Sequence, residues 1–399
     1  MARRNKAYRF RCSFAIRQYT TKAHTTFFSL MKKLASNFSC TLALCLAVAQ
    51  LAIAGNDSKR GQGGASQLTI NPWARSSGMG GANAGGIRGL ESMNMNIAGL
   101  AYLKSTSLIF STVDYLRGTD IRVNSLAFGT PLSGSGVLGM SVSAVSLGNF
   151  VETTYELPEG TGNTFKPSFY NIAVGYSKKF SKSITGGILL RAVYEGIANV
   201  NAFGVGFDAG IQYQTGEKDA FKFGVTIQNV GPKMQYRGEG LSFRGSRDAI
   251  GLTVASKSQA SELPSLINIS TTYDIVSTDL YRVTGAFAFT SNSYTKDNIV
   301  PGAEFAFRDL FMVRAGYVFK QKFSFSQGSS TDAHTGLCAG ATFNVPLSRN
   351  KTTGEVELET TVEADAKPKK NPIALGIDYS FRATAPFNGT HSLGVIVSF

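Results

Sequence analysis

The chain has 399 residues, 43 glycines, a hydrophobic content of 43% and a formal charge of +14 at pH 7. Residues 1–54 hold nine of the 40 Lys and Arg residues and none of the 26 Asp and Glu residues, so the remainder has 31 basic and 26 acidic side chains, a charge of +5. That near balance argues against a nucleic-acid partner. Only one of the four cysteines, Cys338, lies outside residues 1–54, which excludes an internal disulfide framework from the rest.

The first segment reads as a leader. Met31-Lys32-Lys33 precedes a mostly apolar run from Thr41 to Ala49, and Ala52-Ile53-Ala54 follows. These are the three parts of a secretory signal peptide, and the apolar run is too short for a membrane-spanning helix. We expect a signal peptide at 31–54, with cleavage between Ala54 and Gly55. Residues 1–30 are then an upstream extension, or alternatively a mitochondrial presequence, because they are basic and lack acidic residues.

Residues 55–104 differ in character from the rest of the chain. Residues 77–86 are small and glycine-rich, and Leu90 to Ala101 predicts a short helix or turn. Neither GxGxxG in a βαβ setting nor GxxxxGK[ST] is present, so a phosphate-binding loop is not supported. Small residues let the backbone approach a wall closely, which favours a plug segment packed inside a barrel.

Alternation with a period of two dominates residues 105–399. In 201–214, for example, six apolar side chains from Phe203 to Tyr213 alternate with Gly, Asp and Gln. A soluble sandwich also alternates, but these runs last about 10 to 14 residues, as a tilted transmembrane strand requires. We expect an all-β fold with these fourteen antiparallel transmembrane strands: 105–115, 120–130, 136–148, 166–179, 183–194, 201–214, 219–229, 264–275, 280–291, 297–307, 309–319, 334–345, 372–382 and 390–399.

The final strand supports the same class. It ends on Phe399, as the closing strand of a bacterial outer-membrane barrel does, and we interpret this residue as a C-terminal barrel signal. An even strand number lets both termini of the chain lie on the periplasmic side. The predicted location is therefore the bacterial outer membrane, with outer-membrane lipid around the apolar face.

The connections fit this topology. Short turns follow even strands at 180–182, 215–218, 276–279 and 308–309, and long connections follow odd strands at 149–165, 230–263 and 320–333. Residues 248–255 are a candidate further strand, and the step at 308–309 is very tight. One long connection, 346–371, follows an even strand and is highly charged. It is either a solvated loop or a docking segment for a periplasmic partner.

Catalytic and metal-binding patterns are not found in the sequence. His334 and His391 are far apart, and with Cys338 they give no metal-ligand spacing. We therefore expect no enzymatic activity, cofactor or metal. Charged residues on the polar strand faces are expected to pair across the lumen, or alternatively to form a track for a ligand: Asp208, Glu304, Asp378, Lys222, Arg314 and Arg382.

Several motifs resemble one family. Gly78-Met79-Gly80-Gly81-Ala82, followed by the stretch from Asn96 through Gly99 to Ala101, is similar to the "GMGGA … NPAGLA" opening of FadL-like barrels, specifically the PorV/PorQ family of Bacteroidetes. Gln228 to Lys233 resembles that family's "NLGPK", and Leu263-Pro264 its later "LP". The resemblance spans residues 67–399 and departs at Ile97, where the family usually has Pro.

The resemblance implies a 14-stranded FadL-like barrel with an N-terminal plug, whose motif residues are Gly78, Met79, Gly80, Gly81, Asn96 and Gly99. It also implies a role in the type IX secretion system, with a large translocon barrel, secreted cargo proteins through their C-terminal signal domains, or an attachment complex as partners. Shuttle, translocon subunit and attachment component remain open. The alternative is a FadL-type channel for hydrophobic small molecules.

Overall fold

The computed structural model describes residues 59, 61–132, 134–247, 250–320, 336–349, 356–358, 373–385 and 387–399. The expected upstream extension at 1–30 and signal peptide at 31–54 lie outside the described residues, as do Gly55, His334 and most of the charged connection 346–371.

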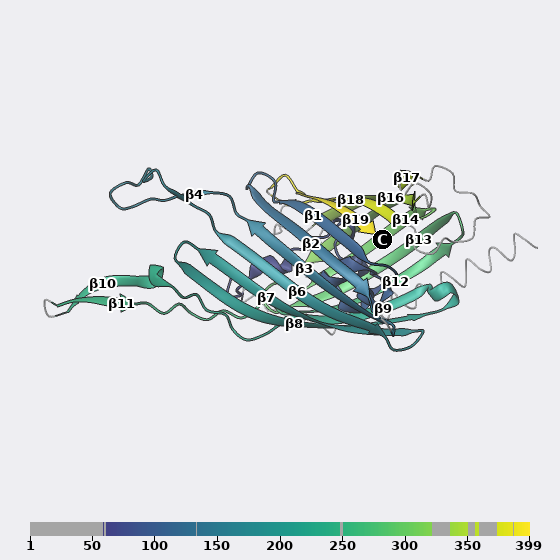
Figure 1. Cartoon of the computed structure of the whole chain (residues 1–399), viewed down its shortest axis with the longest axis horizontal. Coiled ribbons are helices and arrows are strands. Elements are labelled where there is room, and N and C mark those ends of the chain that lie inside the picture. The colour runs from purple at the N-terminus through teal and green to yellow at the C-terminus, as the bar shows by residue number, and fades with distance from the viewer. Residues whose placement is uncertain are drawn as a thin grey trace, which may run out of the picture. The chain divides into compact units, whose positions relative to one another are not determined.

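Fourteen strands form a closed antiparallel barrel (Figure 1), which confirms the predicted fold class and strand number. Consecutive barrel strands pair with each other, and the barrel closes where β1 pairs with β19. The barrel strands are β1 (Ser107–Tyr115), β2 (Ile121–Pro131), β3 (Gly136–Ser146), β6 (Ser168–Lys179), β7 (Ile184–Ile197), β8 (Val200–Thr215), β9 (Phe221–Val230), β12 (Leu266–Ser277), β13 (Tyr281–Asn292), β14 (Asn298–Phe307), β15 (Phe311–Lys320), β16 (Gly336–Arg349), β18 (Ile373–Arg382) and β19 (Thr390–Ser398).

Five further strands lie outside the closed ring. The hairpins β4–β5 (Phe150–Val151 and Thr164–Phe165) and β10–β11 (Ser242–Arg247 and Ile250–Ala255) extend beyond the same end of the barrel (Figure 1). Of the candidate strand at 248–255, residues 250–255 form a strand, which belongs to a separate two-stranded sheet. β17 (Val356–Leu358), inside the charged connection, pairs with the end of β16.

The two ends of the barrel differ in their connections. We call the end with the β3–β6 and β9–β12 connections the long-connection end, and the opposite one the short-turn end. The tight step between β14 and β15 is a turn in which Arg308 and Asp309 have φ of 50° and 51°. Two successive residues with positive φ match the right-handed twist of a hairpin, which explains how so short a connection is possible.

The faces of the strands follow the predicted alternation. In β8, Phe203, Val205 and Ile211 are exposed on the outer wall, whereas Asp208 and Gln212 are buried. Apolar side chains also cover the outer face of β2, β3, β6 and β7. A barrel with an apolar outer face and a polar interior is suited to lipid outside.

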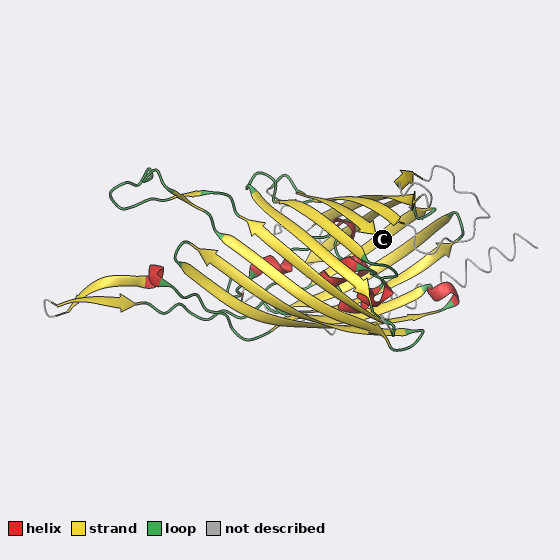
Figure 2. Ribbon diagram, viewed as in Figure 1, coloured by secondary structure: helices red, strands yellow, loops and turns green. Residues whose placement is uncertain are grey.

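The chain before β1 runs through the interior of the barrel (Figure 2). This inner segment, residues 66–102, contains α2 (Ala74–Ser77) and the 3₁₀ helices η2 (Ser66–Thr69), η3 (Ala82–Gly85), η4 (Leu90–Asn94) and η5 (Ile97–Tyr102). It begins at the long-connection end, where Gly64 N–H donates to Glu262 O at 2.9 Å, and leads to the start of β1 at the short-turn end. Two more 3₁₀ turns, η6 (Glu217–Asp219) and η7 (Glu239–Leu241), lie in connections. No described helix is long and apolar enough to cross a membrane.

Candidate functional site

A buried cluster bends the wall at the end of β9. The β8–β9 register shifts at Asp208, whose Oδ1 accepts a 2.7 Å hydrogen bond from Asn229 N–H. Asp208 Oδ2 accepts another, also 2.7 Å, from Arg191 Nη2. Asn229 has a φ of 58°, and its Nδ2 donates to Pro264 O at 3.1 Å. A residue with left-handed backbone conformation and a bulge change the direction of a strand. At this point β9 therefore turns away from β12.

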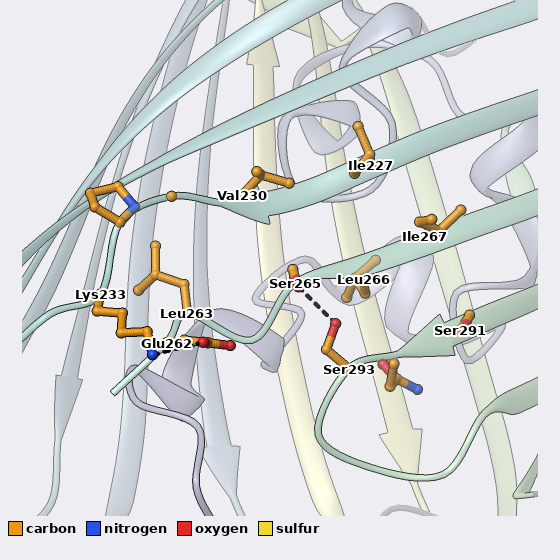
Figure 3. A pocket seen from close by; sticks show the side chains of 13 residues that line it. Ile227, Val230, Lys233, Glu262, Leu263, Ser265, Leu266, Ile267, Ser291 and Ser293 are labelled. Carbon is orange, nitrogen blue, oxygen red and sulfur yellow. Dashed lines mark hydrogen bonds and ion pairs between the residues drawn. The ribbon is translucent and has the colours of Figure 1, made fainter. Parts of the chain in front are cut away.

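The redirected strand leaves a notch in the wall. The β9–β12 ladder ends at Gln228 and Leu266, and a cavity of 390 Å³ lies beyond it (Figure 3). Ile227 and Ile267, 39% and 46% exposed on the outer face, line it together with the buried Leu263. The notch therefore joins the outer wall to the barrel interior. Its apolar lining is Ile227, Val230, Pro232, Leu263, Leu266 and Ile267, and its polar lining includes Lys233, Glu262, Ser265 and Ser293.

The rim of the notch is polar, and an ion pair and a hydrogen bond hold its side chains in place. Lys233 Nζ lies 3.0 Å from Glu262 Oε1, and the Tyr294 hydroxyl donates a hydrogen bond to the same carboxylate. That hydroxyl and then Lys233 lower the pKa of Glu262, so the carboxylate stays charged. Burial, followed by the hydrogen bond to Glu262, raises the pKa of Tyr294 to about 12.

A second cavity lies behind the notch. This chamber, of 230 Å³, shares Leu266 and Asn292 with the notch and is lined mostly by amide and hydroxyl side chains such as Asn268 and Thr290. The inner segment contributes Gly80 and Met95. The chamber thus continues the notch inward, as far as the inner segment.

A third cavity, of 300 Å³, lies at the short-turn end, and we call it the vestibule. Arg75, Arg88 and Glu91 of the inner segment line it with Lys222 of β9 and Arg282 of β13. Among the residues that the structure describes, none lines both the chamber and the vestibule. The inner segment therefore separates the two ends of the lumen.

The first group of predicted plug residues lies against β15 and β16. Gly78 is so close to the wall that a Cβ there would lie 2.9 Å from Gly340 Cα. Met79 is buried, and its carbonyl oxygen lies against Gly316. Gly80 and Gly81 have φ of 63° and 86°, a left-handed turn that favours glycine. Close contact with the wall thus explains the absence of a side chain at Gly78, and the left-handed backbone explains it at Gly80 and Gly81.

The second group lies against the opposite wall. Asn96 is fully buried, and its Oδ1 accepts from Ala98 N–H at 3.2 Å, which caps η5. Its Nδ2 donates to Ile211 O of β8 at 3.3 Å. Ile97 occupies the first position of η5, where proline is also tolerated, so the departure from the family motif is compatible with this turn. At Gly99 a Cβ would lie 2.2 Å from Ile87 O.

The inward charges are largely paired. Lys222 Nζ lies 2.6 Å from Asp274 Oδ2, and Arg314 Nε lies 3.0 Å from Glu304 Oε2. Arg314 also lies 4.0 Å from Asp378 Oδ1, and Asp208 pairs with Arg191. Arg382 lines the chamber. Phe399, the predicted barrel signal, is exposed at the short-turn end, where its N–H donates to Thr106 O at 2.8 Å.

Sequence reasoning missed the notch and the vestibule. The stretch Gln228 to Lys233 is recognisable in the sequence only as a family-like motif, although Asn229 is where β9 turns away from β12. The signal for the buried pair was Arg191, a cation between the apolar residues Leu189 and Val193 on the inward face of β7. Arg75, Arg88 and Glu91 carried no pattern that would unite them, because the fold brings them together.

No protein-family model matches the chain, and neither does any curated protein. Solved structures similar to it include the CymD monoaromatic hydrocarbon channel, at 12% identity and a TM-score of 0.46 over 84% of this chain and 98% of that one. The Pseudomonas putida toluene transporter TodX has the same identity and TM-score over 82% and 98%. A Pseudomonas aeruginosa FadL homologue has 12% identity and a TM-score of 0.44 over 81% and 96%. These likenesses say nothing of what this chain binds.

Proposed function

We propose that this chain is a non-enzymatic outer-membrane barrel that admits small hydrophobic molecules through the notch between β9 and β12. One observation carries the proposal: an apolar cavity of 390 Å³ lies where the wall ladder ends, and residues of the outer face line it. A ligand pocket is a concave, mostly apolar cavity of about 300–1,000 Å³ with a few polar groups. The notch fits that description in size and in chemistry.

The notch offers an apolar molecule a route that avoids water. Such a molecule can meet Ile227 and Ile267 from the lipid side and Leu263 from within. Burying its surface there is favoured by about 25 cal/mol for each Å² removed from water. The chamber behind the notch is lined mostly by amide and hydroxyl side chains, with Lys320 and Arg382 as its charged residues.

A binding measurement tests this function. Radiolabelled toluene is titrated against the full chain in lipid nanodiscs, with empty nanodiscs as the background. Ile267→Trp should fill the notch and abolish saturable binding, whereas Ile188→Trp, on the exposed outer face of β7, should not. Equal binding by the two variants, or no binding above empty nanodiscs, contradicts the proposal.

A second function is favoured by a separate observation. The hairpins beyond the long-connection end expose large apolar side chains to solvent, among them Tyr155 at 102%, Phe243 at 57% and Leu252 at 46%. On the hairpin β10–β11, Phe243 and Leu252 lie close to each other in the ladder, and exposed apolar surface of this kind can mark a protein contact site. This supports the type IX secretion role that the PorV/PorQ resemblance implies, with a translocon barrel, a cargo signal domain or an attachment complex resting on the hairpins.

Affinity purification from native outer membranes in mild detergent tests the second function. Co-purification of a very large barrel or of signal-bearing cargo, lost when residues 242–255 are replaced by a Gly-Ser loop, would favour the secretion role. Replacement of residues 150–165 provides a parallel test for the other hairpin. A barrel purified alone, with its toluene binding intact, would leave only the channel.

A further inference from the structure

The vestibule is lined by more charged side chains than the notch or the chamber. Five cationic side chains line it, against three carboxyl groups: Arg75, Arg88, Lys218, Lys222 and Arg282 against Glu91, Asp274 and Glu304. It lies at the short-turn end, since Lys218 belongs to the β8–β9 turn and Arg282 to the start of β13. The inner segment separates it from the notch and the chamber.

Two of the three acidic residues of the vestibule, Asp274 and Glu304, already have partners. Asp274 accepts from Lys222 at 2.6 Å and from the Thr284 hydroxyl at 2.7 Å. Glu304 lies 3.0 Å from Arg314 and 3.6 Å from Arg282. These two carboxylates therefore have little capacity left for the remaining cations.

Three cations stay without a carboxylate partner within the described residues. Arg75 donates to Met312 Sδ, and Arg88 donates to Gln214 Oε1 at 3.1 Å and lies over the Tyr102 ring at 4.5 Å. Lys218 is exposed on its turn. A guanidinium has five N–H donors in a planar fork that matches phosphate and carboxylate groups, so these hydrogen bonds among the described residues use only a minority of the donors of Arg75 and Arg88.

Glu91 does not offset this excess. Its side chain is buried, and its Oε2 has no hydrogen-bond partner. Burial, followed by the charge of Asp378, raises the pKa of Glu91, which favours the neutral form of its carboxyl group. A cavity with unpaired cations and low-dielectric walls concentrates anions.

We propose that the vestibule binds an oxyanion, the phosphate or carboxylate group of a small molecule, through Arg75, Arg88 and Lys218. Hydrogen bonds between charged partners are about twice as strong as neutral ones, and arginine can bind such a group through two bonds at once. The site does not depend on the notch. A ligand reaches it from the short-turn end, and either site can be removed without the other.

Calorimetric titration of the full chain in neutral detergent at pH 7 tests the site, with inorganic phosphate in one arm and succinate in the other. We expect saturable binding of at least one anion. Arg75→Gln or Arg88→Gln should each weaken it about tenfold or more, the loss expected when a charge-assisted hydrogen bond is removed. Binding of one anion alone identifies whether phosphate or carboxylate is preferred.

Arg122→Gln is the matched control, because Arg122 is exposed at the other end of the barrel, on β2. It removes the same charge and should leave the affinity unchanged. Lys218→Gln, on an exposed turn, provides a variant without risk to the packed interior and should also weaken binding. No saturable binding of either anion, or equal loss in Arg122→Gln, overturns the proposal. Neither result affects toluene binding at the notch, so the two proposals fail independently.

Discussion

Arg191 and Asp208 form a buried ion pair in the barrel wall, with 2.7 Å between Nη2 and Oδ2 and both side chains 3% exposed. Asp208 also accepts the backbone N–H of Asn229, the residue just beyond the end of the β9–β12 ladder. One carboxylate thus links β7, β8 and the turned end of β9. We infer that this link keeps the notch open.

Removal of that carboxylate should destabilise the barrel. Asp208→Ala leaves the Arg191 guanidinium buried without its partner, and breaking a buried pair costs about 3–5 kcal/mol. The free energy of unfolding, measured by urea titration in detergent, checks this. Asp114→Ala is the control: its pair with Arg117 is exposed and 3.9 Å long, and such pairs are worth about 0–1 kcal/mol. Equal losses in the two variants would refute the structural role of Asp208.

The orientation of the strands predicts a contrast between neighbouring residues. Val225 and Ile377 lie exposed on the outer wall, whereas Asp378 is buried and accepts from the Thr342 hydroxyl. Val225→Arg or Ile377→Arg should cost about 2–4 kcal/mol, because each puts a cation into lipid. Asp378→Asn keeps an acceptor and should be tolerated. The amount of heat-resistant folded barrel on gels measures all three, and similar losses would show that the assigned faces are wrong.

Close packing of the inner segment against the wall can be tested at one glycine. A Cβ at Gly316 would lie 2.5 Å from Met79 O, so Gly316→Ala must displace the inner segment or β15. We expect a loss of about 1–3 kcal/mol, as for other overpacked sites, together with faster proteolysis of residues 66–102. At Gly394 the nearest atom, Ala74 Cβ, would be 3.5 Å away, so Gly394→Ala is the control. An inner segment equally protected in both variants would contradict this packing.

Glu91 predicts a dependence of stability on pH. Burial and then Asp378 raise the pKa of Glu91 from 4.5 to about 8, against the opposing effects of Arg75 and Arg314. The folded state therefore binds the proton more tightly than the unfolded state does. This contribution is fully present below pH 4.5 and is lost as the pH rises through about 8.

The melting temperature should accordingly fall between pH 6 and pH 9, and Glu91→Gln, which stays neutral, should reduce that fall. Thermal scans of both proteins in the same detergent measure it. An unchanged fall in Glu91→Gln would assign the pH dependence to other groups.

The barrel itself could be predicted from the sequence because the alternation of apolar and polar residues along a strand is a local property. Phe203 to Tyr213 reveal their faces without knowledge of any neighbour, and the same holds for the other strands. Turn lengths then gave the two ends. The 3₁₀ helices of the inner segment were harder to predict, because the positions of residues such as Gly78 and Gly99 depend on tertiary contacts with Gly340 and Ile87.

The cavities could not be predicted because they arise from register and topology. The notch exists because the β9–β12 ladder stops at Gln228 and Leu266, which depends on the bulge of β9 opposite Asp208 of β8. The vestibule unites Arg75 and Lys218, which are far apart in the sequence. A periodic sequence pattern cannot predict that these two residues lie close together.

The central claim is that apolar molecules enter at the notch, and uptake by cells tests it most directly. Toluene uptake is compared in cells that express equal amounts of folded wild-type protein, Ile267→Trp and Ile188→Trp. We predict faster uptake with the wild type and with Ile188→Trp than in cells without the protein, and none of this gain with Ile267→Trp. A gain that survives Ile267→Trp, or no gain with any of the three, would contradict entry through the notch.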